Sequence, residues 1–411
     1  MRLILLVPAI ALIMAACRPG QNTPTDPLFK KLSADESHIN FINTVTDDKE
    51  FNIFNYRNFY NGGGVAIGDV NNDGLSDVLL IANMGDNKLY LNQTKAGEAM
   101  QFDDVTTKAG VAGKRAWSTG ATFADVNGDG RLDIYICNAG IREGDNRANE
   151  LYINNGNDAT GIPTFTERAA EYGLDDQGYS THAAFFDYDR DGDLDMYLLN
   201  NSFIPVGRLQ YANLRAERDS TGGDKLFRND GKRFTDVSEK AGIYGSLIGF
   251  GLGITVGDVN EDGWLDIYIS NDFYERDYLY INKHDGTFAE TIKEAMPHTS
   301  LSSMGSDVAD INNDGKLDIF ITDMLPGNDR RLKKTSTFEG HDLETIKHDR
   351  DFHYQIMQNM LHLNVGNQPG NGGLPTFSEV ARFAGVQATD WSWGALIFDM
   401  DNDGLKDIFV A

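Results

Sequence analysis

The sequence predicts an all-β protein built from repeated four-stranded units. An acidic decapeptide of the type "GDVNNDGLSD" recurs six times in the 411-residue chain, a β-rich run follows each copy, and two further phrases recur in fixed order between the copies. The copies are roughly 66 residues apart, which is small for a row of β-sandwich domains but suits a repeat of four short strands. Four-stranded units arranged radially form a β-propeller, which is the fold we expect.

Each repeat contains four phrases, and each phrase is expected to supply one strand. The first leads into the acidic loop, as in "WSTGATFADVNGDG" (117–130), "YSTHAAFFDYDRDG" (179–192) and "WSWGALIFDMDNDG" (391–404). The second follows the loop and reads "DVLLIAN", "DIYICN", "DMYLLNN", "DIYISN", "DIFITD" or "DIFVA". The third is "LYLN" (89–92) with copies at 151–154, 226–229, 279–282 and 361–364, and the fourth is "FDDVTTKAGV" (102–111) with copies at 165–174, 234–243 and 377–386 and a weaker one at 288–295. Short β-branched and aromatic runs bounded by Gly, Asn or Asp are a strand signature.

The acidic loops have the composition of a calcium site. Numbered from the first aspartate, every loop has oxygen-bearing side chains at positions 1, 3 and 5, glycine at position 6 and aspartate at position 9. Hard oxygen ligands around a sharp glycine turn suit Ca²⁺, which takes roughly six to eight oxygens. The position-7 residue, whose side chain varies, would contribute its backbone carbonyl. The predicted ligands are Asp69, Asn71, Asp73, Leu75, Asp77; Asp125, Asn127, Asp129, Arg131, Asp133; Asp187, Asp189, Asp191, Asp193, Asp195; Asp258, Asn260, Asp262, Trp264, Asp266; Asp310, Asn312, Asp314, Lys316, Asp318; and Asp399, Asp401, Asp403, Leu405, Asp407.

Other metal loops fit the pattern less well. An EF-hand requires a bidentate glutamate at position 12 and flanking helices. Here the flanks are predicted strands, and position 12 is Leu80, Ile136, Leu198, Ile269, Ile321 or Val410. Mg²⁺ prefers fewer protein ligands, and zinc prefers His or Cys. We therefore expect about one Ca²⁺ per repeat, held in a loop that ends inside a strand.

The N-terminus predicts export. Residues 1–16 have a positive residue followed by an apolar run too short for a comfortable membrane span, which is typical of a signal peptide. The run ends in "MAAC", which resembles a bacterial lipobox and makes Cys17 the expected lipidation site; the alternative is an ordinary signal peptide of a secreted protein. Residues 17–38 would be a flexible tether and 39–411 the propeller. Because Arg18, not Asp, follows the cysteine, we expect an outer-membrane or cell-surface lipoprotein. Cys137 is expected to be a small buried strand residue.

Charge and motifs argue against several function classes. A net charge of −26 argues against nucleic acid and against simple docking on anionic lipid, so membrane contact would come from the lipid anchor alone. The sequence contains no His-Glu-x-x-His helix, Gly-x-Ser-x-Gly elbow or complete phosphate loop. His182 and His362 replace residues of the repeat and are expected to be structural. We therefore expect a protein that is not an enzyme, with a polysaccharide hydrolase or lyase as the alternative.

Two insertions interrupt the repeats, at 201–223 and 323–360. The second is strongly charged, contains the basic residues Arg330, Arg331, Lys333 and Lys334, and is expected to end in a short helix. Loops on a rigid scaffold are where binding usually occurs, so both are candidate binding segments. The alternative is that both insertions only cap the edges of blades.

Over residues 39–411 these phrases resemble FG-GAP/VCBS repeats, the units of integrin α-chain propellers. The phrase with "F-x-D-V-T/S" and "A-G" resembles, more narrowly, bacterial repeat proteins related to cartilage acidic protein, which usually carry a C-terminal ASPIC/UnbV domain. The resemblance implies a seven-bladed propeller with calcium in its outer-loop turns and a role in adhesion or binding. Because "DNDGLKDIFVA" falls within the second strand of the sixth unit, we interpret the chain as C-terminally incomplete. The expected function is a calcium-binding module for a surface glycan or protein; a structural subunit of an envelope complex is a further alternative, and the oligomeric state is unknown.

Overall fold

The computed structural model describes residues 28–204, 206–336, 339–367 and 372–411. The chain divides into two units, Met1–Ser33 and Ala34–Ala411, and the helices and strands given below belong to the second. The predicted signal segment and Cys17 lie outside the described residues. Within the described ranges, no helix combines the length and the apolar character needed to cross a bilayer.

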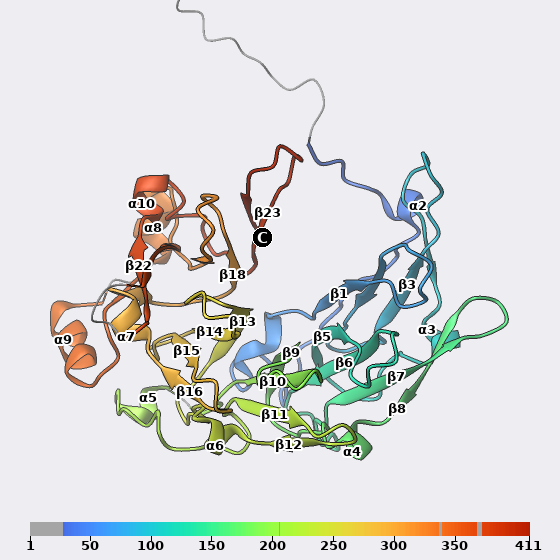
Figure 1. Ribbon diagram of the computed structural model, residues 1–411, viewed down its shortest axis with the longest axis horizontal. Helices are drawn as coiled ribbons and strands as arrows, with labels where there is room; N and C mark the ends of the chain where they lie inside the picture. The colour runs from blue at the N-terminus through green and yellow to red at the C-terminus, as the bar shows by residue number, and fades with distance from the viewer. Residues whose placement is uncertain (1–27, 205, 337–338, 368–371) are drawn as a thin grey trace, which may run out of the picture. The chain divides into compact units, whose positions relative to one another are not determined.

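The second unit is dominated by antiparallel sheets that follow one another in chain order around a common centre (Figure 1). The predicted four strands per repeat are confirmed in five sheets, and β23 and β24 form a sixth, two-stranded sheet. The sheets are β1 (Val65–Gly68), β2 (Asp77–Leu80), β3 (Lys88–Asn92), β4 (Phe102–Asp104); β5 (Ser118–Ala124), β6 (Asp133–Asn138), β7 (Glu150–Asn157), β8 (Pro163–Glu167); β9 (Ser180–Phe186), β10 (Asp195–Asn200), β11 (Lys225–Asn229), β12 (Phe234–Asp236); β13 (Gly251–Gly257), β14 (Asp266–Asn271), β15 (Tyr278–Asn282), β16 (Phe288–Glu290); β18 (Ser306–Ala309), β19 (Asp318–Ile321), β21 (Met360–Asn367), β22 (Pro375–Glu379); and β23 (Ala395–Phe398), β24 (Asp407–Val410). The fold is therefore all-β and propeller-like.

The second strand of a sheet shows how neighbouring sheets pack. All six residues of β6 are buried. Ile134 lies in an apolar cluster with Leu79 of the first sheet, whereas Cys137, on the opposite face of the strand, lies in a cluster with Met196 of the third sheet. Successive side chains of a strand point to opposite faces, so a strand covered on both faces reads as a continuous apolar run. Cys137 is buried, as predicted, and burial raises the pKa of its thiol.

The fourth phrase of each repeat forms a short outer strand and then a one-turn helix. These helices are α3 (Thr106–Ala109), α4 (Ala169–Tyr172), α6 (Ser238–Ala241), α7 (Ile292–Ala295) and α10 (Ala381–Ala384). Four of them end at a glycine in the left-handed conformation, for example Gly110 with φ of +80°. Glycine is favoured there because a Cβ penalises positive φ. The recurring "A-G" and "Y-G" pairs therefore mark helix ends, whereas the repeat pattern predicted only strands for these phrases.

The inner strands β1, β5, β9, β13, β18 and β23 contact one another in that order. Their spacing is tight at the glycine of the "WSTG" phrase. A Cβ on Gly120 would meet the Thr181 carbonyl oxygen at 2.3 Å, and one on Gly305 would meet the Trp393 carbonyl oxygen at 2.4 Å. Glycine at this repeat position thus allows the neighbouring backbone to approach.

An aromatic segment before the first sheet fills space beside these inner strands. It includes the 3₁₀ helix η1 (Arg57–Tyr60), and its blue ribbon lies among the inner strands in Figure 1. Phe51 and Phe59 both contact the buried Trp117, with ring centroids 4.7 and 5.3 Å away. The repeat pattern does not predict this packing, because the aromatic segment belongs to no repeat.

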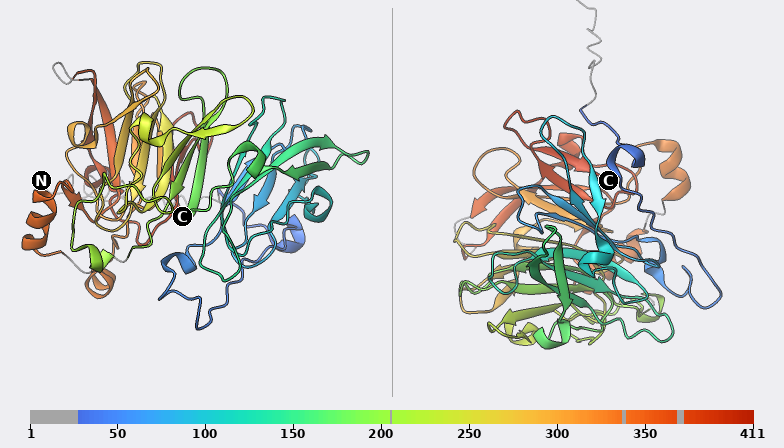
Figure 2. Two further views of the ribbon diagram at one scale, coloured as in Figure 1. Left: turned by 90° about the horizontal axis from the view of Figure 1, so that it is seen from below. Right: turned by 90° about the vertical axis from the view of Figure 1, so that its right-hand side faces the viewer.

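The described helices of the insertions are α5 (Val206–Leu209), α8 (Asp329–Thr335) and α9 (His341–Asp349), and α2 (Ala34–Ser37) begins the unit. The second insertion contains two helices, where the sequence predicts one. It also includes β20 (Gln355–Ile356), which pairs in parallel with β17 (Thr299–Ser300). Figure 2 shows α8 and α9, in orange, outside the sheets.

A buried polar residue precedes the third strand of each four-stranded sheet. Its side-chain oxygen accepts a hydrogen bond from the backbone N–H at the end of the second strand, at 2.7 to 3.0 Å. The residue is Asn87, Asn149, Asp224, Asp277 or Asn359. Burial raises the pKa of Asp224 and Asp277 to about 7. Their hydrogen bonds favour the charged form and only partly oppose this shift. Two sheets therefore carry an acid where the other three carry a neutral amide.

Replacing Asp224 by asparagine is expected to stabilise the protein increasingly as the pH rises. The folded pKa is above the unfolded value of about 4, so the folded state binds the proton more tightly and the wild type loses stability between about pH 4 and 7. Asn149 occupies the equivalent position in the second sheet and shows that an amide fits there. Its Nδ2 donates a hydrogen bond to the Tyr135 hydroxyl at 3.0 Å, whereas Asp224 accepts a hydrogen bond from the equivalent Tyr197 hydroxyl. Urea denaturation at pH 5 and 8 should show the advantage of Asp224→Asn growing by about 2 kcal/mol.

The reciprocal change Asn149→Asp serves as the control and should lose stability over the same interval. All other titrating groups are common to the compared proteins, so their contributions cancel. An Asp224→Asn variant that is destabilised equally at pH 5 and pH 8 would contradict the assignment.

Candidate metal sites

The six acidic loops share one hydrogen-bonding pattern. In the first loop, Asp69 accepts hydrogen bonds from the backbone N–H groups of Asp73 at 3.1 Å and Gly74 at 2.7 Å, and Asp73 accepts from Leu75 at 2.9 Å. Gly74 has φ of +89°, which explains the glycine at position 6. The bond from the position-6 N–H to the position-1 carboxylate recurs in every loop, from Gly130, Gly192, Gly263, Gly315 and Gly404. The backbone therefore gathers the side-chain oxygens at positions 1, 3 and 5 into a turn.

The position-9 aspartate joins each loop to its sheet. Asp77 is the first residue of β2, and it accepts hydrogen bonds from the backbone N–H groups of Val70 at 2.9 Å and Asn92 at 2.8 Å. Asn92 is the asparagine of the "LYLN" phrase, so this interaction connects the two motifs. Equivalent bonds join Asp133 to Asn154, Asp195 to Asn229, Asp266 to Asn282 and Asp318 to Asn364.

The same asparagines connect loops of adjacent sheets. The Asn154 side chain donates to the backbone carbonyl of Val70 at 2.9 Å, in the loop of the preceding sheet. The bonds from Asn229 to Val126, from Asn282 to Tyr188 and from Asn364 to Val259 repeat this link. Each of these asparagines therefore contacts the loops of two adjacent sheets.

The position-9 carboxylates are in an environment that disfavours their charge. Burial raises the pKa of Asp195 and Asp266 to about 7 and that of Asp77 and Asp133 to about 6; the backbone hydrogen bonds oppose this shift, and neighbouring aspartates add to it. Burial also raises the pKa of Asp318. A bound cation would compensate such buried and mutually repelling charges.

The third loop fits a cation best. Carboxylate oxygens of Asp187, Asp189 and Asp195 lie within 4.8 Å of one another. The Asp189 Oδ1 atom is buried without a hydrogen-bond partner, and burial raises the pKa of this carboxyl. In the sixth loop, Asp399, Asp401 and Asp403 form a similar group. These two loops have aspartate at position 3, where the other four have asparagine, and among the described residues they are the two groups of three acidic or histidine side chains that come this close.

Three other loops have a basic side chain against the position-5 carboxylate. Arg131 pairs with Asp129, the Lys316 Nζ lies 3.6 Å from Asp314, and His284 Nε2 lies 2.8 Å from Asp262. Position 7 varies among the loops, which suggested that its side chain is unconstrained. In two loops, however, the position-7 side chain contacts the position-5 carboxylate, through Arg131 and Lys316. The cationic side chains of Arg131 and Lys316 reduce the negative charge available to a metal ion, so these two loops should bind Ca²⁺ more weakly than the third and sixth.

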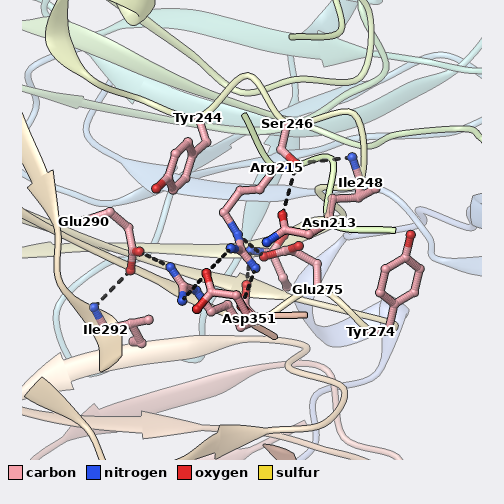
Figure 3. Close-up of polar contacts among 12 residues, drawn as sticks. Asn213, Arg215, Tyr244, Ser246, Ile248, Tyr274, Glu275, Glu290, Ile292 and Asp351 are labelled. Carbon is pink, nitrogen blue, oxygen red and sulfur yellow. Dashed lines mark hydrogen bonds and ion pairs between the residues drawn. The ribbon is translucent and has the colours of Figure 1, made fainter. Parts of the chain in front are cut away.

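The two insertions meet over the fourth sheet in a network of charges that is buried except at the half-exposed Asp351 (Figure 3). Arg215 of the first insertion lies between Glu275, with Nε to Oε1 of 2.7 Å, and Asp351 of the second insertion, with Nη1 to Oδ2 of 3.1 Å. Arg276 pairs with Glu290 and lies 3.7 Å from Asp351. The side chains of Arg215 and Glu275 are 5% and 0% exposed, respectively. The buried parts of the insertions therefore hold each other against the fourth sheet, in agreement with the capping alternative.

Two of the described histidines lie near one another: the ring centroids of His298 and His362 are 6.4 Å apart, and His298 Nε2 lies 3.8 Å from a Glu379 carboxylate oxygen. His362 is fully buried, both of its ring nitrogens lack a hydrogen-bond partner, and burial lowers its pKa to about 3. It is therefore neutral. His182 lies on β9 at the position where β5 has Gly120, and burial lowers its pKa.

Comparison with known proteins identifies the repeats. A family model described as FG-GAP-like repeat matches residues 52–136 and 258–321. Cartilage acidic protein 1 of Mus musculus is 25% identical over 281 residues, covering 62% of this chain and 39% of the mouse protein. The Xenopus tropicalis protein is 25% identical over 321 residues, covering 74% of this chain and 45% of the frog protein. The chain spans less than half the length of these curated relatives.

Among solved structures, an Agrocybe aegerita lectin that recognises non-reducing terminal N-acetylglucosamine has a TM-score of 0.38 and 15% identity, over 84% of this chain and 70% of the lectin. Rhamnogalacturonan lyase YesW has a TM-score of 0.36 and 14% identity, over 85% of this chain and 55% of the lyase. With TM-scores this low, we draw no functional argument from either structure.

The fold and its acidic loops define an all-β repeat protein of the propeller type. More specifically, two segments of the chain match the FG-GAP-like repeat, and part of the chain is similar to the proteins named Cartilage acidic protein 1.

Proposed function

We propose that this protein is a calcium-stabilised β-propeller that acts as an exported binding module. The observation that carries the calcium assignment is the third loop, where Asp189 has a buried oxygen without a hydrogen-bond partner and carboxylate oxygens of Asp187, Asp189 and Asp195 lie within 4.8 Å of one another. In this proposal those three residues and Asp191 hold the ion, with the backbone carbonyl of Asp193 as a further ligand. The other five loops follow the same scheme.

Binding, rather than catalysis, is the function we propose on this scaffold. The carboxylates of the acidic loops are assigned to the metal, and the buried Arg215 of the first insertion is paired with Glu275. The proposed partner is a surface glycan or protein. Export and anchoring through Cys17 would place the module at the cell surface, where divalent calcium is available to its loops.

Retention on an immobilised panel of glycans and envelope proteins tests this function. We expect the full-length chain to be retained by at least one member in the presence of calcium, and released by a chelator, because ordered loops hold adjacent blades in register. Release of oligosaccharide products from a panel glycan would favour a hydrolase or lyase instead. A calcium-loaded, folded protein that no member retains would contradict the binding role.

A further inference from the structure

A pocket of about 130 Å³ lies where the inner strands of the sheets begin. We call it the axial pocket. It is lined by Asn58, Asn61, Gly62, Thr119, Thr181, Leu252, Met304 and Trp393. Five of these residues occupy one repeat position, the third residue of the "WSTG" phrase: Thr119, Thr181, Leu252, Met304 and Trp393. Because the inner strands lie side by side, equal repeat positions converge on this pocket.

The pocket position varies, although its neighbours in the repeat hardly change. The preceding residue is serine in four of the five repeats, and these serines are buried. The following residue is glycine in four of the five, and backbone contacts explain this at Gly120 and Gly305. Between them the side chain ranges from threonine to tryptophan. Packing therefore restricts the two flanking residues. It does not restrict the pocket residue, whose identity can instead serve ligand binding.

The pocket combines uncharged polar groups with an aromatic ring. Thr119 Oγ1 donates to the Ser180 carbonyl at 2.7 Å and Thr181 Oγ1 to the Leu199 carbonyl at 3.3 Å, so each hydroxyl oxygen keeps lone pairs with which to accept a hydrogen bond. Asn61 brings an exposed carboxamide from the end of η1. On the apolar side, Trp393 is 46% exposed and offers a ring face.

These features indicate the chemistry of the ligand. None of the eight lining residues is charged, and the chain as a whole has a net charge of −26, so an anionic ligand would be repelled. Four of the lining residues are polar and uncharged, and three are apolar, including one aromatic residue; polar groups that converge beside apolar surface are typical of small-molecule sites. A neutral sugar matches both parts of the pocket, since its hydroxyl groups require donors and acceptors while its C–H face packs on an aromatic ring.

We propose that the axial pocket binds a single uncharged sugar residue, with Trp393 as the stacking surface and the Thr119 and Thr181 hydroxyls and the Asn61 carboxamide as polar contacts. This inference rests on the proposed binding function and assigns it a site. It also places the binding site outside the two insertions, which contribute Arg215 and Asp351 to the charge network.

The test uses the full-length chain in calcium and the methyl glycosides of glucose, galactose, mannose and N-acetylglucosamine, titrated by ligand-observed NMR. Methyl glucuronide is the anionic counterpart. We expect at least one neutral glycoside to bind and Trp393→Ala to weaken it about tenfold, the size of effect that loss of an aromatic contact can produce. Thr181→Val, which removes only the hydroxyl, should weaken it several-fold.

Trp391→Ala is the matched control, because Trp391 is 56% exposed in the same phrase but does not line the pocket. It should change affinity less than about twofold. Equal effects of Trp393→Ala and Trp391→Ala, tighter binding of the glucuronide, or no binding of any neutral glycoside would overturn the proposal. If the panel glycan or protein is still retained by Trp393→Ala, the binding function stands and only its assignment to this pocket is wrong.

Discussion

Chelation of divalent cations is expected to lower the melting temperature of this protein by on the order of 10 °C, because the loops would lose the ions that offset their clustered carboxylates. A site held at one hundred times its Kd adds about 2.7 kcal/mol to the free energy of unfolding. Two such sites, the third and sixth loops, would add about 5 kcal/mol, and a domain of this size changes its melting temperature by about 2 °C per kcal/mol. Thermal denaturation with calcium and with chelator measures the difference.

The effect should extend beyond the loops themselves. Without a cation, Asp187, Asp189 and Asp195 repel one another at short range. The asparagine side chains that connect each loop to the preceding sheet, such as Asn229 to Val126, would then transmit the disorder between blades. We therefore expect loss of calcium to destabilise the whole second unit cooperatively.

Two variants of the third loop localise the effect. Asp189→Asn removes the buried carboxylate with the unpartnered oxygen and should weaken the tightest calcium site about tenfold in a calorimetric titration. Asp193→Asn changes the position-7 side chain, whose proposed contribution is its backbone carbonyl, and should have a much smaller effect. A melting temperature indifferent to chelator, or equal calcium affinities for the two variants, would contradict the calcium assignment.

Replacing Arg215 by methionine is expected to destabilise the protein by about 3–5 kcal/mol, because it leaves the carboxylate of Glu275 buried without its cation. The Glu275 side chain is 0% exposed, and its second oxygen already lacks a hydrogen-bond partner. Asp351 would lose its bond to Arg215 at the same time, and with it a link between the two insertions. Urea denaturation measures the change in the free energy of unfolding.

A double variant distinguishes the cost of leaving a buried charge unpaired from the cost of changing the Arg215 side chain itself. Arg215→Met with Glu275→Leu removes both charges and should recover much of the lost stability, since apolar replacements of buried ion pairs are often neutral. Lys88→Met, which breaks the half-exposed pair with Asp104, should cost less than about 1 kcal/mol. If Arg215→Met resembled Lys88→Met, the network would not be what holds the insertions in place.

The repeats made most of the fold predictable. The period of the acidic loops and the four phrases between them predicted the sheets, because each phrase is short, β-rich and bounded by turn residues. The loop composition likewise predicted the glycine turn, whose positive φ at Gly74 follows from sterics local to the chain. The one-turn helices after the outer strands could not be predicted in the same way, because a single helical turn is too short to show a helical periodicity.

The ranking of the loops depended on contacts that the repeat pattern does not contain. Whether Arg131 or His284 points at a carboxylate is decided by side-chain placement across strands, not by position in the motif. The axial pocket likewise depends on contacts that the repeat pattern does not contain. Thr119 and Trp393 occupy equal repeat positions, but only the arrangement of the inner strands brings residues so distant in sequence to one site.

By itself, then, the sequence determined the strand content, the acidic turns and the all-β repeat, because these follow from local conformational preference and a repeated pattern of burial. The tertiary structure alone decided which asparagine connects which loops, which insertions meet through Arg215 and Asp351, and which residues surround the axial pocket. The physical reason is that these features depend on contacts between sheets, which are set by how whole blades pack against one another.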